Sequence, residues 1–138
     1  MKKSNKEWRL YPTEDNFKTE EQLSRACFDW FDKTFKAEFR GILYLNFNNP
    51  KDARQGNTLV AQGLRKGSPD FTLAIPLFSK GIASLYIELK MDKGVVSEAQ
   101  KKQHKVLEKF GHKVIIICSL RHFQEAVTQW VILFRKEA

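Results

Sequence analysis

The fold is decided by a stretch that begins Gly67-Ser68-Pro69-Asp70, continues Phe71-Thr72-Leu73-Ala74-Ile75, turns near Ser79-Lys80-Gly81 and ends Leu85-Tyr86-Ile87-Glu88-Leu89-Lys90. Apolar residues alternate with others in both halves, which is the period of a strand with one buried face. The proline favours extended backbone and suits a strand entrance, so we expect Asp70 where the first strand starts. The middle segment is rich in turn formers. The stretch therefore predicts an antiparallel hairpin.

In such a hairpin, Asp70 lies near the level of Glu88 and Lys90, at the end away from the turn. If Asp70 shares their face, two carboxylates and one ammonium converge. Converging carboxylates repel each other unless a cation lies between them, and hard oxygen ligands suit Mg2+ or Mn2+. A lysine beside that cation can contact a phosphate or the attacking water. The pattern favours metal-assisted hydrolysis of a phosphodiester.

Length, composition and charge indicate a single globular domain with an excess of basic residues. The 138 residues fit one domain, and an apolar fraction of 42% is typical of a globular protein. Lysine and arginine number 24 against 16 acidic residues, which gives a net charge of +8. An excess of this size favours a polyanionic partner such as nucleic acid.

The cysteines argue against metal binding through sulfur. Cys27 and Cys118 are the two cysteines, and no Cys-x-x-Cys or His-x-x-x-His spacing occurs, so we expect free thiols and no zinc site. The sequence also lacks a long apolar segment and an export signal, so we expect a cytoplasmic protein without a membrane partner.

The N-terminal part predicts a tail over residues 1–18 and a helix from Thr19, where Thr19-x-x-Gln22 fits a capping box. An apolar stripe follows at helical spacing: Leu23, Ala26, Cys27, Trp30 and Phe31. Glu20 lies on this stripe, near the core edge where a carboxylate needs a partner, and Glu21 lies about 100° away. Glutamates in a first turn often only complement the helix dipole, which is the alternative for both.

A strand is expected over residues 41–47, followed by a long polar connection to Gly67. Connections of this length are more often functional or mobile than structural. Part of it, residues 58–64, fits a short helix. Its basic residues precede Asp70, and we expect them to meet substrate phosphates, a solvated loop being the alternative: Lys51, Arg54, Arg65 and Lys66.

Beyond the hairpin, Ser97-x-x-Gln100 is a second capping box, and Gly111 ends the helix that it starts. As an ordinary capping residue, Gln100 needs no catalytic role. His104 lies one turn further on, where we expect a surface or core histidine, the alternative being a residue that contacts the site residues. Residues 113–118 predict a strand covered on both faces. A final helix with a core stripe completes an α/β domain with a mixed sheet flanked by helices, in the order αβββαβα.

Pro69-Asp70 and Glu88-Leu89-Lys90 resemble the PD-(D/E)XK nuclease motif. The longer pattern, from Gly63 through Ser97-Glu98-Ala99-Gln100, resembles the virus-type replication-repair nuclease (VRR-NUC) branch of that superfamily, and the resemblance covers roughly residues 19–118. It implies a restriction-endonuclease-like fold for a single domain over residues 19–138. Five residues would form the site: Glu20, Asp70, Glu88, Lys90 and Gln100.

The resemblance also implies roles for these residues. Asp70, Glu88 and the Leu89 carbonyl would ligate Mg2+ or Mn2+, and Glu20 would complete the site directly or through water. Lys90 would orient the attacking water, and the Gln100 amide would orient the lysine, a water or a phosphate.

The function expected is that of a divalent-metal-dependent endodeoxyribonuclease. Stand-alone members of this size are similar to phage and bacterial proteins that cut branched DNA, including four-way junctions, and a symmetric homodimer would supply two paired incisions. One alternative is a nicking or restriction-like nuclease on ordinary duplex DNA. Another is a DNA-binding module with an inactive site, although such a site would be free to lose Asp70, Glu88 or Lys90.

Overall fold

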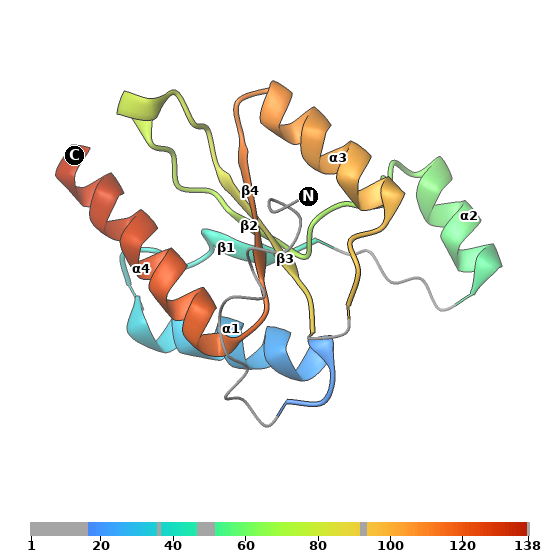
Figure 1. Cartoon of the computed structure of the whole chain (residues 1–138), viewed down its shortest axis with the longest axis horizontal. Coiled ribbons are helices and arrows are strands. Elements are labelled where there is room, and N and C mark those ends of the chain that lie inside the picture. Colours follow the sequence, from blue (N-terminus) through green and yellow to red (C-terminus); the bar gives the residue numbers. More distant parts are fainter. Residues whose placement is uncertain (1–16, 36, 47–51, 92–93, 138) are drawn as a thin grey trace, which may run out of the picture.

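A computed structural model describes residues 17–35, 37–46, 52–91 and 94–137 (Figure 1). In chain order the elements are α1 (Glu20–Thr34), β1 (Leu43–Leu45), α2 (Ala53–Ala61), β2 (Phe71–Leu73), the 3-10 helix η2 (Phe78–Lys80), β3 (Leu85–Leu89), α3 (Glu98–Lys109), β4 (Lys113–Ile117) and α4 (Leu120–Glu137). The four strands form one sheet in the order β1-β2-β3-β4. β4 runs parallel to β3, whereas the other neighbours are antiparallel. The predicted α/β class with a mixed sheet is confirmed.

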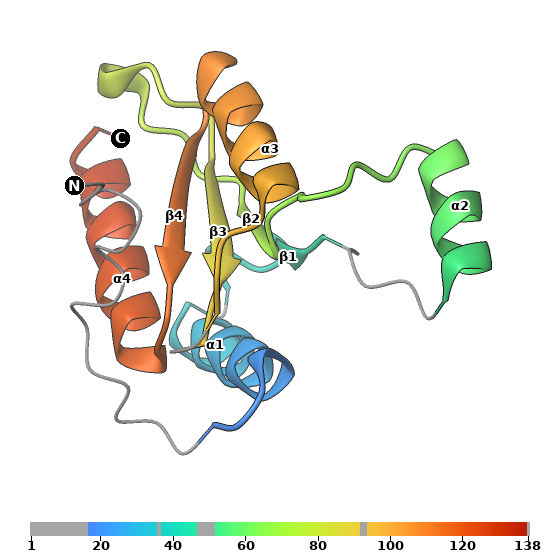
Figure 2. The same cartoon turned by 45° about the vertical axis from the view of Figure 1, so that its right-hand side comes forward.

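Helices cover both faces of the sheet. α1 and α4 pack against each other, with α1 also contacting β3 and α4 contacting β4, while α3 lies along β4 on the opposite side (Figures 1 and 2). α2 stands apart from these layers at the end of an extended connection, and none of its residues, all described, is buried (Figure 2). Among the described residues, no helix is long and apolar enough to cross a membrane.

The core lies between the sheet and the pair α1 and α4. Each helix contributes buried residues at a spacing of four, which places them on one stripe. The stripes consist of Leu23, Cys27 and Phe31 on α1 and of Phe123, Val127 and Val131 on α4. Trp30 and Phe123 meet edge to face, with ring centroids 5.9 Å apart, which links the two helices. Both helical stripes were predicted from the sequence.

The hairpin forms as predicted. Phe71 pairs with Ile87 and Leu73 with Leu85, so β2 and β3 are antiparallel neighbours. The chain reverses direction at η2. Gly81 caps the C-terminal end of this 3-10 helix with a φ of +67°, a left-handed conformation that glycine adopts without strain. Asp70 consequently lies at the open end of the hairpin, beside the end of β3.

Several expected boundaries and exposures are corrected. β2 is not half-buried: all its residues are buried, because it lies between β1 and β3 and is covered on both faces. β4 was expected to be covered on both faces, yet only Ile117 is fully buried, because β4 is an edge strand. β1 spans Leu43–Leu45, so the expected strand does not include Gly41, Ile42 or Asn46, while Phe47 lies outside the described residues.

The short helix expected over residues 58–64 starts earlier than predicted. α2 begins at Ala53, because the side chain of Asp52 accepts a hydrogen bond from the Gln55 backbone and caps the helix. At α1, Thr19 caps the helix through Gln22 N, but the Gln22 side chain accepts from Lys18 N rather than Thr19 N. The second capping box, at α3, is complete.

Candidate active site

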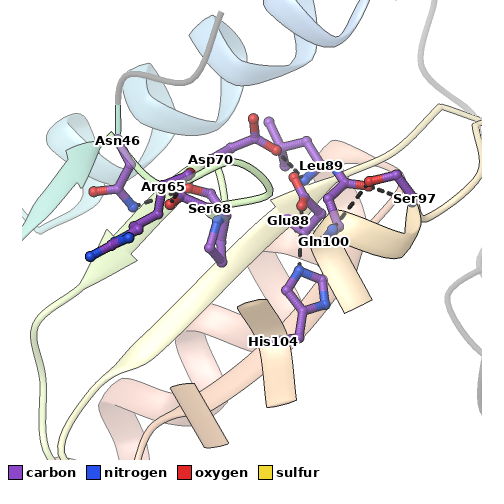
Figure 3. A network of polar contacts seen from close by, with 10 residues as sticks. Asn46, Arg65, Ser68, Asp70, Glu88, Leu89, Ser97, Gln100 and His104 are labelled. Atoms are coloured by element: carbon purple, nitrogen blue, oxygen red, sulfur yellow. Dashed lines mark hydrogen bonds and ion pairs between the residues drawn. The ribbon is translucent and has the colours of Figure 1, made fainter. Parts of the chain in front are cut away.

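The hairpin brings Asp70 against the end of β3. Because Phe71 pairs with Ile87, the next position outward sets Asp70 at the level of Glu88. The Oδ2 atom of Asp70 accepts a hydrogen bond of 2.7 Å from the Leu89 backbone N–H (Figure 3). One carboxylate oxygen is therefore fixed by the backbone, and the carboxyl group is held beside Glu88.

Glu88 is the most buried carboxyl group of the site, with 1% of the residue exposed. Burial raises the pKa of Glu88 to about 10, with further contributions from a hydrogen bond to Asp70 and from the charges of Asp70 and Glu20. The positive charge of Lys90 acts in the opposite direction. In the metal-free protein, Glu88 is consequently a neutral acid at pH 7 that hydrogen-bonds to Asp70. Two carboxyl groups held this closely are suited to sharing a cation instead of a proton.

Lys90 follows directly on β3, and only 9% of it is exposed. Its backbone N–H donates to Ile117 O over 2.9 Å, so β4 fixes the main chain at this position. The δ-carbon of its side chain would lie 3.2 Å from a Cβ added at Gly94, so a larger residue there would crowd it. The ammonium is thus carried on a constrained side chain, and its charge acts on the carboxyl groups of Glu20 and Glu88.

The first turn of α1 distinguishes its two glutamates. Partial burial raises the pKa of Glu20, while Lys90 lowers it and Asp70 raises it. Much of Glu20 remains solvent-exposed, yet it lies within the electrostatic influence of the site. Glu21 instead forms an exposed ion pair of 3.0 Å with Arg25, one turn along the helix. The structure thus places Glu20 beside the predicted site and Glu21 away from it.

α3 contributes two polar residues. The Oε1 atom of Gln100 accepts a hydrogen bond of 2.8 Å from Ser97 N, so this oxygen belongs to the capping box. His104 projects from the next turn toward β3, and its Nε2 lies 3.4 Å from Oε1 of Glu88 (Figure 3). Burial is the main cause that lowers the pKa of His104. A surface or core histidine was the favoured expectation, but His104 takes the alternative place beside the site, because the phase of α3 turns it toward Glu88.

Asn46 is a residue of the site that the sequence interpretation missed. Its backbone N–H donates to Asp70 O over 2.7 Å, and its Nδ2 donates to Pro69 O over 3.1 Å. The same amide exchanges hydrogen bonds with the hydroxyl of buried Thr72. Asn46 therefore fixes the chain on both sides of Asp70 (Figure 3). The available signal was a polar residue at the end of a short apolar strand, which points to no specific partner.

A close backbone approach fixes the segment before Asp70. Gly67 has a φ of +82°, and an added Cβ would lie 2.4 Å from the carbonyl atoms of Ala99. Only glycine fits here, so the loop packs directly on the first turn of α3. The two segments that carry Asp70 and Gln100 are thereby held together.

The basic residues of the connection lie outside the carboxylate cluster. Arg54 is on α2, Arg65 and Lys66 follow it, and all three are exposed. The carbonyl of Arg65 accepts hydrogen bonds from the backbone and hydroxyl of Ser68, while its side chain points away from Glu88 (Figure 3). Lys51 lies outside the described residues.

The oxygen atoms present fit a hard divalent cation. In the described ranges, no three Asp, Glu, His or Cys side chains converge closely enough to hold a metal ion by themselves. Asp70 and Glu88 would need a backbone carbonyl and water to complete the coordination. Mg2+ is commonly bound in this way, through one or two carboxylates with several retained waters.

Comparisons with known proteins agree with this arrangement. The model of the VRR-NUC domain matches residues 18–119, the range that holds the hairpin, α3 and the start of α1. A solved structure described as a VRR_NUC domain protein superposes with a TM-score of 0.66 at 18% identity, covering 86% of this chain and 93% of that chain. No curated protein gives a significant match. Because the family model spans most of the sequence, this chain belongs to the VRR-NUC family, which implies a nuclease of the PD-(D/E)XK type.

Proposed function

We propose that this protein is a divalent-metal-dependent endodeoxyribonuclease with a preference for branched DNA. The observation that carries the proposal is the pair Asp70 and Glu88, in which a buried carboxyl group lies against a second one fixed by the backbone. A structural role alone does not account for two adjoining carboxyl groups, because each raises the free energy of ionising the other. A bound cation offsets this repulsion, so that both carboxyl groups can be ionised and can act as metal ligands.

Asp70, Glu88 and the Leu89 carbonyl would hold Mg2+ or Mn2+, with Glu20 acting through a water. When bound, the cation would polarise the phosphate and lower the pKa of a coordinated water. The protein's part is to fix the carboxylates before substrate binds. The hydrogen bonds to Asp70 from Leu89 and to the adjoining backbone from Asn46 supply that fixation.

Lys90 would orient the attacking water and stabilise the charge that develops on the phosphate. Its side chain is largely buried and therefore restricted, which favours a preorganised donor. Phosphoryl-group reactions depend chiefly on such positioning and charge stabilisation. The Gln100 amide, one element away, would assist by orienting the lysine, a water or a phosphate.

The charge distribution supports DNA as the substrate. The chain carries a net charge of +8, and four basic residues stand in the connection before Asp70: Lys51, Arg54, Arg65 and Lys66, of which the last three are described and exposed. These residues would bind phosphates flanking the cleaved bond. We expect a single nuclease domain over residues 19–138 with a tail over residues 1–18, acting in the cytoplasm.

Branched-DNA selectivity and a homodimer are proposed together. One site cuts one strand per encounter, whereas a four-way junction is resolved by two paired incisions. A symmetric dimer places two such sites on one substrate. If the dimer neutralises roughly six to ten phosphates, its affinity should fall by about 10³–10⁵-fold between 50 and 200 mM salt.

The test is a cleavage assay of four-way, flapped and linear DNA of matched sequence, with Mg2+, Mn2+ or EDTA, alongside light scattering. We expect a dimer that cuts the four-way junction faster than linear duplex, and no cleavage in EDTA. A monomer that cuts linear duplex equally fast would refute the junction preference and support the nicking or restriction-like alternative. Tight DNA binding without cleavage under any metal condition would refute the enzymatic proposal.

A further inference from the structure

Two buried polar atoms lie opposite each other between α3 and β3. His104 Nε2 and Glu88 Oε1 are 3.4 Å apart, on side chains that are 14% and 2% exposed. Among the described residues, neither atom has a hydrogen bond of acceptable geometry. A buried polar atom without a partner is costly, so a pair of them in contact calls for an explanation.

Apolar packing of α3 does not explain the contact. None of the twelve residues of α3, all of which are described, is fully buried. The helix is held at its start by the complete capping box and by the close approach of Gly67 to Ala99. The close approach of Gly67 to Ala99 and the contacts of α3 with β4 place the helix, and its phase then directs His104 toward Glu88.

The need for a donor arises when the site takes up a cation. Glu88 must then be ionised, and an ionised oxygen buried away from water requires a hydrogen bond or a positive charge. Asp70 already has its Leu89 donor, whereas Oε1 of Glu88 has none among the described residues. His104 Nε2 lies within a few tenths of an ångström of ordinary hydrogen-bond distance, so a small reorientation of the ring would align an Nε2–H with Oε1 of Glu88.

We propose that His104 is a positioning residue for metal binding. Its Nε2–H donates to Oε1 of ionised Glu88 and leaves the other carboxylate oxygen directed at the cation. This inference rests on the proposed metal-dependent function. Both the charged imidazole and the neutral Nε2–H tautomer can donate, so it does not depend on the charge of His104. Hydrogen bonds to metal-ligating carboxylates commonly orient them in this way.

The experiment measures Mn2+ and Mg2+ affinity of the full chain by calorimetry, without DNA. His104→Leu should weaken both affinities by about 10–100-fold, the range typical of lost support for a metal ligand. His104→Gln should restore most of the affinity, because its amide nitrogen can reach the position of Nε2. Lys105→Ala, an exposed neighbour on α3, serves as the matched control and should bind as the wild type does.

Cleavage kinetics provide a second measurement. His104→Leu should need more metal for half-maximal rate, and saturating metal should restore most of kcat, with an unchanged KM for DNA. Metal could also offset a general loss of folded protein, because binding stabilises the folded state, so the stability of the metal-free variants has to be measured as well. Thermal unfolding of the metal-free variants checks that each is folded.

Three outcomes separate the possible failures. Equal metal affinities for His104→Leu and wild type would overturn the positioning role and leave the nuclease proposal standing. A loss confined to Mn2+ would also overturn it, because it would identify His104 as a direct ligand, imidazole being suited to Mn2+ more than to Mg2+. Equal binding by wild type and Asp70→Ala, or no binding by either, would refute the proposed metal site itself.

Discussion

Asp70 and Leu89, nineteen residues apart in the sequence, are joined by a hydrogen bond of 2.7 Å from the Leu89 backbone N–H to Asp70 Oδ2. This bond crosses the open end of the β2–β3 hairpin. It fixes one oxygen of Asp70 while the carboxyl group remains in contact with Glu88. The orientation of Asp70 is therefore a property of the folded chain and exists before any cation binds.

Lys90 should contribute to turnover more than to metal binding. Lys90→Ala is expected to lower kcat by at least about 10²-fold, the scale observed when one group that stabilises a transition state is removed. Mn2+ affinity should persist, since the carboxylates remain. Single-turnover cleavage measures the loss of rate, and calorimetry measures the Mn2+ affinity. Lys102→Ala, on the exposed face of α3, is the control. Undiminished cleavage by Lys90→Ala would exclude the role assigned to the ammonium.

Glu20 and Glu21 should behave differently despite being adjacent. Glu20→Gln should strongly reduce cleavage, because it removes a charge that interacts with Lys90 and Asp70. Glu21→Gln should be nearly silent, because it breaks only an exposed ion pair, and such pairs contribute about 0–1 kcal/mol. Cleavage rates of both variants, measured over the same range of Mn2+ concentrations, test this difference. The reverse order of effects would assign the site role to Glu21.

Asn46 should affect both stability and activity. Asn46→Ala removes its side-chain bonds to Pro69 and Thr72 and is expected to destabilise the fold by about 1–3 kcal/mol. Displacement of Asp70 should lower cleavage by up to about 10²-fold. Urea unfolding and cleavage rates provide the two measurements, with Asn57→Ala on exposed α2 as control. Wild-type activity in a folded Asn46→Ala protein would show that the hydrogen bonds of the Asn46 side chain do not position Asp70.

Without metal, stability should fall as the pH rises from 7 to 9. The pKa of Glu88 is raised from 4.5 to about 10, so between these values the folded state retains a proton that the unfolded state releases. Added Mn2+ should reduce the fall, because it takes the place of that proton. His122, whose pKa burial lowers to about 4, is neutral in the folded state over this range, and in the unfolded state only a minor fraction of it is protonated at pH 7 and almost none at pH 9. Urea midpoints measured in EDTA should decline for the wild type and stay nearly level for Glu88→Gln. Parallel curves would contradict the raised pKa.

Much of the fold was predictable because its signals are local. The alternation on either side of Ser79-Lys80-Gly81 identified the hairpin, and helical periodicity identified the stripes of α1 and α4. The start of α2 was missed although Asp52 supplies an ordinary N-cap. The exposure of β4 could not be predicted, because a strand's apolar composition does not reveal whether it lies at an edge.

The convergence of the two carboxyl groups was predictable because both residues lie on the hairpin itself. Asp70 and Glu88 approach each other because the pairing of β2 with β3 requires it. Asn46 reaches Asp70 only through the pairing of β1 with β2, and His104 reaches Glu88 only through the rotation of α3 on the sheet. Both contacts depend on long-range packing, which one sequence does not specify.

The central claim is that Asp70 and Glu88 hold the cation that drives DNA cleavage, and Asp70→Asn tests it most directly. The asparagine side-chain oxygen can still accept the Leu89 N–H, so the fold should persist while one ligand charge is lost. Cleavage of a labelled four-way junction should be compared at equal Mg2+ for both proteins, purified free of host nucleases. We predict cleavage by the wild type that EDTA abolishes, and a loss of at least about 10²-fold in Asp70→Asn. Equal cleavage by the two proteins would contradict the account.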